Sequence, residues 1–279
     1  MKPLRFYTNC YGNKFAPYLY VLLQSIDEIY GSDAQAIVYY DDLAIDAVSS
    51  IKRKMPHAKL YHYNLRQRGG FFYERKGEPH KAQFQIAKAR HFITASVDDA
   101  LDGPMVILDC DMLVTKRLDE YVSYVDNCDM VFTYKSEPDE QLQWPINSGI
   151  QIINNSLKIR KFYSLWHNET NWIIRHNGDP RNLWGGMQQA AFGRIIKTRD
   201  IEDYKNGFAR NGCHLRGVPC KYLNETRRTQ EFDDACIVHY KGHWRGVLPD
   251  KEMNHRVNRA NAGKMYDLWQ GHLERWNVR

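Results

Sequence analysis

Residues 105–114 read MVILDCDMLV, four apolar residues followed by a D-x-D triplet and further apolar residues. A glycine–proline break precedes the run, so residues that interrupt regular structure bound it on both sides. A short apolar run of this kind is typical of a strand that is buried on both faces. We therefore expect a central strand of a sheet at 105–108, with Asp109 and Asp111 at its carboxyl end.

The D-x-D triplet predicts a metal site. Two carboxylates at positions i and i+2, where a strand ends and the chain can bend, can both face one cation. Hard divalent cations such as Mn²⁺ and Mg²⁺ prefer oxygen ligands and leave coordination positions open for phosphate oxygens. A cation there would neutralise the charge that grows on a departing phosphate group. The alternative is a solvated strand end, because turn-forming aspartate pairs are common.

The residues before this strand alternate between strand and helix patterns. We expect strands at 4–8, 36–40 and 59–63, and helices at 18–29, 44–55 and 81–96. This alternation predicts an α/β fold with a parallel sheet and right-handed crossovers, whose ligands gather at the carboxyl ends of the strands. Thr8, Asn9, Asp41 and Asp42 stand at such ends together with the D-x-D triplet. These are side chains that a nucleotide site would need.

The second half of the chain is less regular. We expect strands at 130–134, 150–153 and 237–240, a helix at 157–175, and a loop with a helix start at 177–193. The last part of the tail again has helical spacing. We divide the chain into a catalytic domain at 1–250 and a C-terminal basic helical extension at 251–279.

The charge of the chain restricts its partners. The net charge of +6 fits an anionic ligand such as a nucleotide diphosphate, and it also fits nucleic acid or an anionic membrane. The basic residues are scattered among acidic ones instead of forming a stripe, so we expect no nucleic-acid partner. Aromatic residues make up 13% of the chain, which suits stacking on sugar rings but suits a tyrosine-rich core equally well.

The six cysteines show no C-x-x-C pair and no disulfide-framework spacing. We interpret them as reduced thiols and expect a cytoplasmic protein, since the chain starts with no apolar export signal. No window of about 18 apolar residues predicts a membrane span. The cysteines and histidines between residues 213 and 239 match no common zinc pattern, so we expect no structural zinc.

Several segments, in order along the chain, resemble those of known enzymes. VILDCDMLV at 106–114 resembles the D-x-D segment of GT-A fold glycosyltransferases, and the chain as a whole resembles glycosyltransferase family 8 and its relatives. FYTNCYGNKFAPYLYVLLQSI at 6–26 is similar to the family's first strand, nucleotide loop and first helix. PINSGIQIINN at 145–155 resembles its N-S-G segment, which lies near the donor sugar and the acceptor.

Two later segments resemble the family with departures. WGGMQQAAFG at 184–193 is similar to the family's D-Q segment without the leading aspartate. IVHYKGHWR at 237–245 resembles the late H-x-x-G-x-x-K segment, with Arg245 where lysine is usual. The resemblance implies a GT-A (Rossmann-like) fold, with a mixed, mostly parallel sheet flanked by helices and a C-terminal helical extension.

The resemblance implies that His239 completes the metal site with Asp109 and Asp111, and that Asp109 also contacts the donor. The alternative for His239 is a structural histidine after an apolar strand. Gly242 would let the backbone approach the donor phosphates. Arg245 would bind the diphosphate, in bidentate fashion if the geometry allows.

The resemblance also implies a donor site and a reaction centre. Thr8, Asn9 and Tyr11 match positions that hold uracil and ribose, with ordinary loop chemistry as the alternative. Asn147 and Gln188 match polar groups near the reacting sugar carbon, and we assign them catalytic roles.

Two of these assignments have rivals. Because Met187 replaces the family's aspartate, the next glutamine, Gln189, could be the functional one. Lys81 opens the helix before the D-x-D strand, where related enzymes often place a donor-binding cation. Lys88 and Arg90 are rivals for that role, and all three side chains could simply be solvated.

The expected reaction is transfer of a hexose from a UDP-sugar to a hydroxyl acceptor on a glycan, glycolipid or protein, assisted by Mn²⁺ or alternatively Mg²⁺. The resemblance implies retention of configuration, and no carboxylate stands out as a general base for inversion. Glutamine could stabilise positive charge on the sugar but is too weak a base for an alcohol. The alternatives are a catalytically silent protein of the same fold, or a nucleotidyltransferase, which would normally show a glycine-rich phosphate loop.

The tail at 251–279 carries six basic against three acidic residues. It places five large apolar side chains largely on one helical face: Met265, Leu268, Trp269, Leu273 and Trp276. We expect this face to pack on the catalytic domain. The alternative is peripheral contact with an anionic membrane, which would bring the enzyme to a lipid-linked acceptor.

Overall fold

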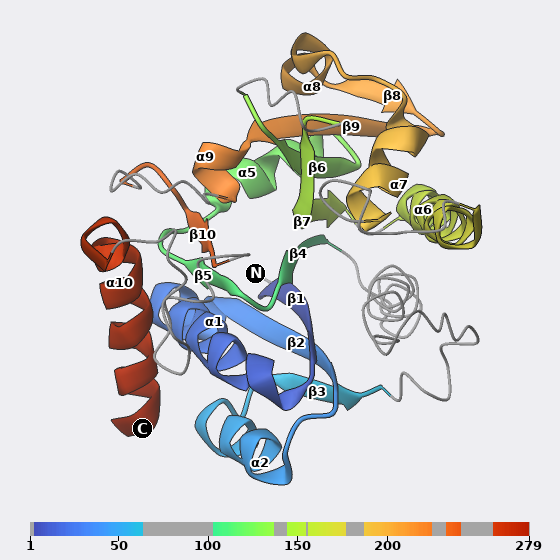
Figure 1. Ribbon diagram of the computed structural model, residues 1–279. Helices are drawn as coiled ribbons and strands as arrows, with labels where there is room; N and C mark the ends of the chain where they lie inside the picture. The colour runs from blue at the N-terminus through green and yellow to red at the C-terminus, as the bar shows by residue number, and fades with distance from the viewer. Residues whose placement is uncertain are drawn as a thin grey trace. The chain divides into compact units, whose positions relative to one another are not determined.

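The computed structural model describes residues 3–63, 103–136, 144–154, 156–176, 187–224, 233–240 and 259–278. Within these ranges the strands are β1 (Leu4–Tyr11), β2 (Ala34–Asp41), β3 (Lys59–His62), β4 (Pro104–Asp109), β5 (Met112–Val114), β6 (Met130–Tyr134), β7 (Ile146–Asn154), β8 (Phe208–Arg210), β9 (Cys213–Pro219) and β10 (Ile237–His239). The helices are α1 (Ala16–Tyr30), α2 (Ile45–Lys54), α5 (Asp119–Ser123), α6 (Leu157–His176), α7 (Met187–Ile196), α8 (Ile201–Asn206), α9 (Cys220–Leu223) and α10 (Arg259–Val278) (Figure 1).

The strands form a mixed, mostly parallel eight-stranded sheet in the order β3-β2-β1-β4-β7-β6-β9-β8, and β10 pairs with β5 in a two-stranded ribbon. β1 pairs with β2 in parallel and β6 with β9 in parallel, whereas β7 and β8 run antiparallel to their neighbours β6 and β9. The predicted α/β fold class is therefore confirmed: a mixed sheet flanked by helices, with a C-terminal helix.

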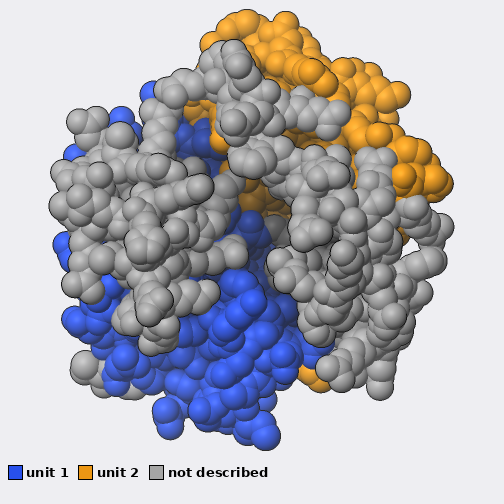
Figure 2. All heavy atoms as spheres, viewed as in Figure 1, with its two compact units in different colours: residues 1–61, 108–118, 220–279 blue, residues 62–107, 119–219 orange. Residues whose placement is uncertain are grey.

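The chain divides into two compact units (Figure 2). Unit 1 comprises residues 1–61, 108–118 and 220–279, and unit 2 comprises residues 62–107 and 119–219. The helix α10 belongs to unit 1. The boundary expected at residue 250 and the helix expected at 81–96 both lie outside the described residues, so these two remain predictions.

Unit 1 contains the β1-α1-β2-α2 alternation that the sequence predicts. Gly12 at the end of β1 has a φ of 92°, a conformation that favours glycine, and its carbonyl accepts a hydrogen bond from the Phe15 amide at 3.0 Å. α1 then starts with Pro17 in its first turn, where the missing amide proton costs nothing. Gly31, with a φ of 52°, ends the helix. These turns direct the chain from the carboxyl end of β1 back to the start of β2.

Unit 2 has an aromatic core between its strands and its helices. Phe132 of β6 contacts Phe192 of α7 and Tyr204 of α8, with ring centroids 5.5 and 5.2 Å apart. Gly217 of β9 is required here, because a Cβ atom at that position would lie 2.7 Å from Tyr204 and 2.8 Å from Tyr134. The close approach of these rings to the backbone therefore depends on a residue without a side chain.

The C-terminal helix α10 packs its apolar face inside unit 1, beside α1 (Figure 1). Met265, Trp269 and Trp276 are buried, and the Trp276 ring stacks on Tyr20 of α1 at a centroid distance of 4.7 Å. The Tyr240 hydroxyl donates to the Met265 carbonyl at 2.7 Å. The expectation that this face packs on the protein is confirmed, and a membrane contact through it is not supported, because the same side chains already have protein neighbours.

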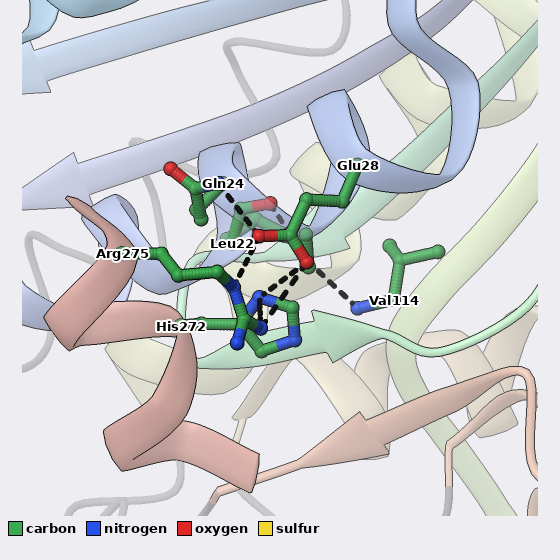
Figure 3. Close-up of polar contacts among 7 residues, drawn as sticks. Leu22, Gln24, Glu28, Val114, His272 and Arg275 are labelled. Atoms are coloured by element: carbon green, nitrogen blue, oxygen red, sulfur yellow. Dashed lines mark hydrogen bonds and ion pairs between the residues drawn. The ribbon is translucent and has the colours of Figure 1, made fainter. Parts of the chain in front are cut away.

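A polar cluster joins α10 to α1 (Figure 3). Glu28 of α1 accepts hydrogen bonds from Gln24 at 2.7 Å and from the Arg275 guanidinium, whose Nη2 also lies 3.0 Å from His272 Nδ1. Burial alone would raise the pKa of Glu28, but the hydrogen bonds from Arg275 and Gln24 outweigh it and lower that pKa. Burial lowers the pKa of His272 despite the nearby Glu28 carboxylate. His272 Nδ1 also lies 3.2 Å from Glu28 Oε2, so the imidazole nitrogen contacts both the carboxylate and the guanidinium.

Among the residues that the structure describes, no helix combines the length and the apolarity needed to cross a membrane.

Candidate metal centre and surrounding site

The D-x-D triplet forms the tight turn between β4 and β5. β4 ends at Asp109, Cys110 and Asp111 form the turn, and β5 begins at Met112. The Cys110 side chain is buried in a cluster that also contains Cys10 of β1. The two aspartates that flank Cys110 are not part of this apolar cluster.

The ribbon of β5 and β10 brings a histidine to this turn. His239 is paired with Met112 and Ile237 with Val114 in the antiparallel register. The amide of Tyr240 donates to the Asp111 carbonyl at 2.8 Å, which ties the end of β10 to the turn itself. The position of the imidazole is therefore set by backbone pairing.

The three side chains converge as a metal site requires. One ligand atom each from Asp109, Asp111 and His239 lie within 4.8 Å of one another. His239 Nε2 is 3.2 Å from Asp111 Oδ1 and 3.8 Å from Asp109 Oδ2. The Asp111 and His239 side chains are almost fully buried, and that of Asp109 is 24% exposed, so Asp109 is the most solvent-accessible of the three.

The donor set fits a hard divalent cation. In octahedral coordination with bonds of about 2.1 Å, neighbouring ligand atoms lie about 3 Å apart and opposite ones about 4.2 Å apart. The observed separations fall close to this range before any adjustment of the side chains. Two carboxylates and one imidazole also suit Mn²⁺, which binds nitrogen as well as oxygen ligands.

The end of β1 carries buried polar groups in need of partners. Thr8 and Asn9 are buried, and within the described ranges Thr8 Oγ1 and Asn9 Nδ2 make no hydrogen bond. Tyr11 is buried as well. A buried polar group without a partner costs about 1–3 kcal/mol. A molecule bound at this strand end could supply the missing hydrogen bonds.

The metal cluster and the β1 end belong to one unit. β1 is the neighbour of β4 in the sheet, and Cys10 and Cys110 share one buried cluster. Their flanking residues, Asn9 and Asp109, therefore come from adjacent strand ends. A nucleotide with its base at one strand end and its diphosphate at the other would need this arrangement.

Asn147 lies at an irregularity of unit 2. The β6–β7 register places Phe132 opposite Gln151 but Thr133 opposite Asn147, so three residues of β7 bulge out. The Asn147 side-chain oxygen accepts a hydrogen bond from the Gly149 amide at 3.0 Å, and its main-chain oxygen accepts one from the Thr133 hydroxyl at 2.9 Å. These bonds fix the side chain within the N-S-G segment.

Gln188 and Gln189 occupy the first turn of α7, and both are buried. The Trp166 indole donates to the Gln188 main-chain oxygen at 2.7 Å and thereby anchors the start of the helix. The two side chains are equally buried, so both Gln188 and Gln189 stay candidates for the functional glutamine. Lys81, Lys88, Arg90, Gly242 and Arg245 lie outside the described residues, and their roles remain predictions.

One polar neighbour of the cluster has no place in the sequence-based hypothesis. Asn224 follows α9, and its side-chain oxygen lies 2.8 Å from His239 Nδ1. The residue lies outside the segments on which the resemblance rests, 15 positions before the histidine. Only the fold brings the two side chains together.

No protein-family model matches the chain, and no curated protein does either. Among solved structures, the galactosyltransferase LgtC with donor and acceptor sugar analogues matches with a TM-score of 0.59 at 12% identity, over 96% of both chains. The bifunctional glycosyltransferase WbbM matches with a TM-score of 0.59 at 11% identity, over 98% of this chain and 50% of its own. The glycosyltransferase GlyE of Streptococcus pneumoniae TIGR4 matches with a TM-score of 0.57 at 13% identity, over 100% and 64%.

These likenesses show that the chain has the fold of GT-A glycosyltransferases. At such low identity they establish the fold alone, and membership of family 8 remains a prediction. The chemistry has to be inferred from the side chains at the carboxyl ends of the strands.

Proposed function

We propose that this chain is a metal-dependent glycosyltransferase that transfers a hexose from a UDP-sugar to a hydroxyl acceptor with retention of configuration. The observation that carries the proposal is the convergence of Asp109, Asp111 and His239 at the end of β4, on a fold shared with glycosyltransferases. The unpaired polar groups of Thr8 and Asn9 on the adjacent strand support a nucleotide beside this cluster. A cytoplasmic location stays a prediction from the sequence.

In the proposed site, Asp109, Asp111 and His239 hold one Mn²⁺, with Mg²⁺ as the alternative. When bound there, the cation supplies Lewis-acid neutralisation of the charge on the departing UDP. Phosphate oxygens would approach from the side of Asp109, the most exposed of the three residues. Thr8, Asn9 and Tyr11 would hold uracil and ribose.

The roles on the sugar that the resemblance implies for Asn147 and Gln188 are proposed as well. Asn147 uses its side-chain oxygen within its own loop, so its amide nitrogen is the end that could donate to a ligand. Gln188, or Gln189 in its place, would present an amide oxygen to the positive charge that develops on the sugar carbon. Neither amide is basic enough to deprotonate an alcohol, so the leaving phosphate is the group proposed to accept the acceptor's proton. A sugar or other carbohydrate is the proposed acceptor.

The test compares the Mn²⁺-dependent turnover of nucleotide sugars by the wild-type protein and by Asp111→Asn. Because the cation contributes several kcal/mol to the transition state, the variant should lose about 100-fold or more in rate of donor hydrolysis without added acceptor. Asp126→Asn, a change at an exposed aspartate of unit 2, is the matched control and should keep the wild-type rate.

Full activity of Asp111→Asn in Mn²⁺ would contradict the metal assignment. A wild-type protein that binds Mn²⁺ and UDP but turns over none of a panel of nucleotide sugars would instead indicate the catalytically silent alternative.

A further inference from the structure

The polar residue behind the metal cluster is held by a rigid frame. Asn224 is fully buried, and its amide donates to the Cys220 carbonyl at 2.8 Å, which continues the turn of α9. The amide of Cys236, just before β10, donates to the Tyr222 carbonyl at 2.6 Å. Backbone bonds therefore fix both α9 and the approach to β10, so Asn224 and His239 face each other in a set geometry.

The contact between the two side chains has a defined direction. Asn224 Oδ1 lies 2.8 Å from His239 Nδ1, on the edge of the ring opposite the aspartates. A carbonyl oxygen can only accept, so Nδ1 carries the proton of this hydrogen bond. Nε2, which lies 3.2 Å from Asp111 Oδ1, is then the nitrogen whose lone pair can bind a cation.

We propose that Asn224 is a positioning residue that holds His239 in the Nδ1–H tautomer and aims Nε2 at the metal. The inference rests on the proposed function, because it assigns a role toward the same cation. Ligating histidines usually donate their second ring proton to an oxygen, which fixes both the tautomer and the ring orientation. Asn224 provides that oxygen from the end of α9, which is separate from the D-x-D turn.

The opposite orientation of the Asn224 side-chain amide would place the imidazole proton of His239 on the other ring nitrogen. If the Asn224 nitrogen faced Nδ1, it would donate, and the imidazole proton would move to Nε2, where it would block the metal. Asn224→Leu separates the two cases, since loss of the amide would weaken Mn²⁺ binding in the first case and strengthen it in the second. In Asn224→Asp the carboxylate can only accept, which favours the Nδ1–H tautomer. Asn224→Leu has a similar size and offers no hydrogen bond at all.

The experiment is a titration of the full-length protein with Mn²⁺, followed by electron paramagnetic resonance. The free-ion signal gives the affinity, and pulsed measurements detect the coupling of Mn²⁺ to the bound imidazole nitrogen. We expect Asn224→Leu to weaken Mn²⁺ binding by about 10- to 100-fold and to reduce the nitrogen coupling. Asn224→Asp should bind Mn²⁺ at least as tightly as the wild type, with full coupling.

Asn171→Leu is the matched control, because Asn171 contacts a ring nitrogen of His167 at 3.0 Å on α6, outside the cluster. It should leave both readouts unchanged. Wild-type affinity and coupling in Asn224→Leu would overturn the positioning role while leaving the proposed function intact. Equal losses in the leucine and aspartate variants would show a packing role only and would also overturn it.

Should Asn224→Leu fail to fold, as judged by near-ultraviolet circular dichroism in EDTA, the aspartate variant decides alone. A folded Asn224→Asp protein without nitrogen coupling would refute the inference. A wild-type protein that does not bind Mn²⁺ would refute the proposed function first, and the two failures are therefore distinguishable.

Discussion

Replacing Trp276 by alanine should destabilise the protein severely, although this residue is the fourth from the end of the chain. The side chain is 1% exposed and packs in a buried cluster with Leu19 and Leu23 of α1, stacked on Tyr20. A buried tryptophan covers about 150–250 Å². At about 25 cal/mol per Å² this corresponds to about 4–6 kcal/mol, and core Trp→Ala changes cost about 3–5 kcal/mol. We expect a loss of about 4 kcal/mol and a fall in Tm on the order of 10 °C.

Urea unfolding followed by far-ultraviolet circular dichroism, without added metal, measures this loss. Trp172→Ala is the matched control, since Trp172 lies on α6 and is 42% exposed. The same chemical change should there cost less, about 2–3 kcal/mol, because a large part of this side chain is already in contact with water. If the two variants lost equal stability, α10 would not be part of the core of unit 1, and the packing argument would be refuted.

Two further results are expected. Folding lowers the pKa values of both His272 and Glu28, so the unfolded chain binds more protons than the folded protein does. The free energy of unfolding should therefore fall as the pH drops below 6.5, the ordinary pKa of histidine, and fall further below 4.5, that of glutamate. Urea midpoints between pH 7 and 5 should decline less in His272→Gln, and parallel declines would contradict this. Calorimetry in Mn²⁺ should show that UDP binds more tightly than GDP or CDP. Asn9→Ala should weaken the affinity for UDP about tenfold. Equal affinities for the three nucleotides would remove the basis for a UDP-sugar donor.

The sequence predicts those elements whose burial leaves a local signature. β4 is buried along its length, so its core is a continuous apolar run, and the strand expected at 105–108 is observed at Pro104–Asp109. The helices expected at 18–29 and 157–175 are likewise present, because each carries apolar residues at helical spacing over several turns.

The elements that the sequence misses depend on distant partners. β9 contains Arg216, Gly217 and Pro219, which individually disfavour a strand, and it exists because it pairs in parallel with β6. β5 is only three residues long and is defined by its pairing with β10. β7 begins four residues earlier than the expected strand at 150–153, because Asn147, Ser148 and Gly149 interrupt the apolar pattern after Ile146. The register with β6 shifts at the same place.

The candidate site shows the same division. Asp109 and Asp111 are evident from the local pattern of a strand end, whereas His239 follows from a resemblance and not from spacing. The role of Asn224 could not be found from the sequence, because no motif or periodicity connects an asparagine to a histidine 15 residues later. Its position depends on α9 and on the backbone bonds that connect α9 to β10.

Asp111 and His239 lie 128 positions apart in the chain, and this distance has a consequence for the order of events during protein synthesis. A nascent chain that has left the ribosome only through β9 already contains every residue of unit 2, which ends at 219, and both carboxylates of the turn. It still lacks the imidazole and the whole of 220–279, which unit 1 requires. Translation therefore completes unit 2 before unit 1, and a three-ligand site can form only after β10 has emerged and paired with β5.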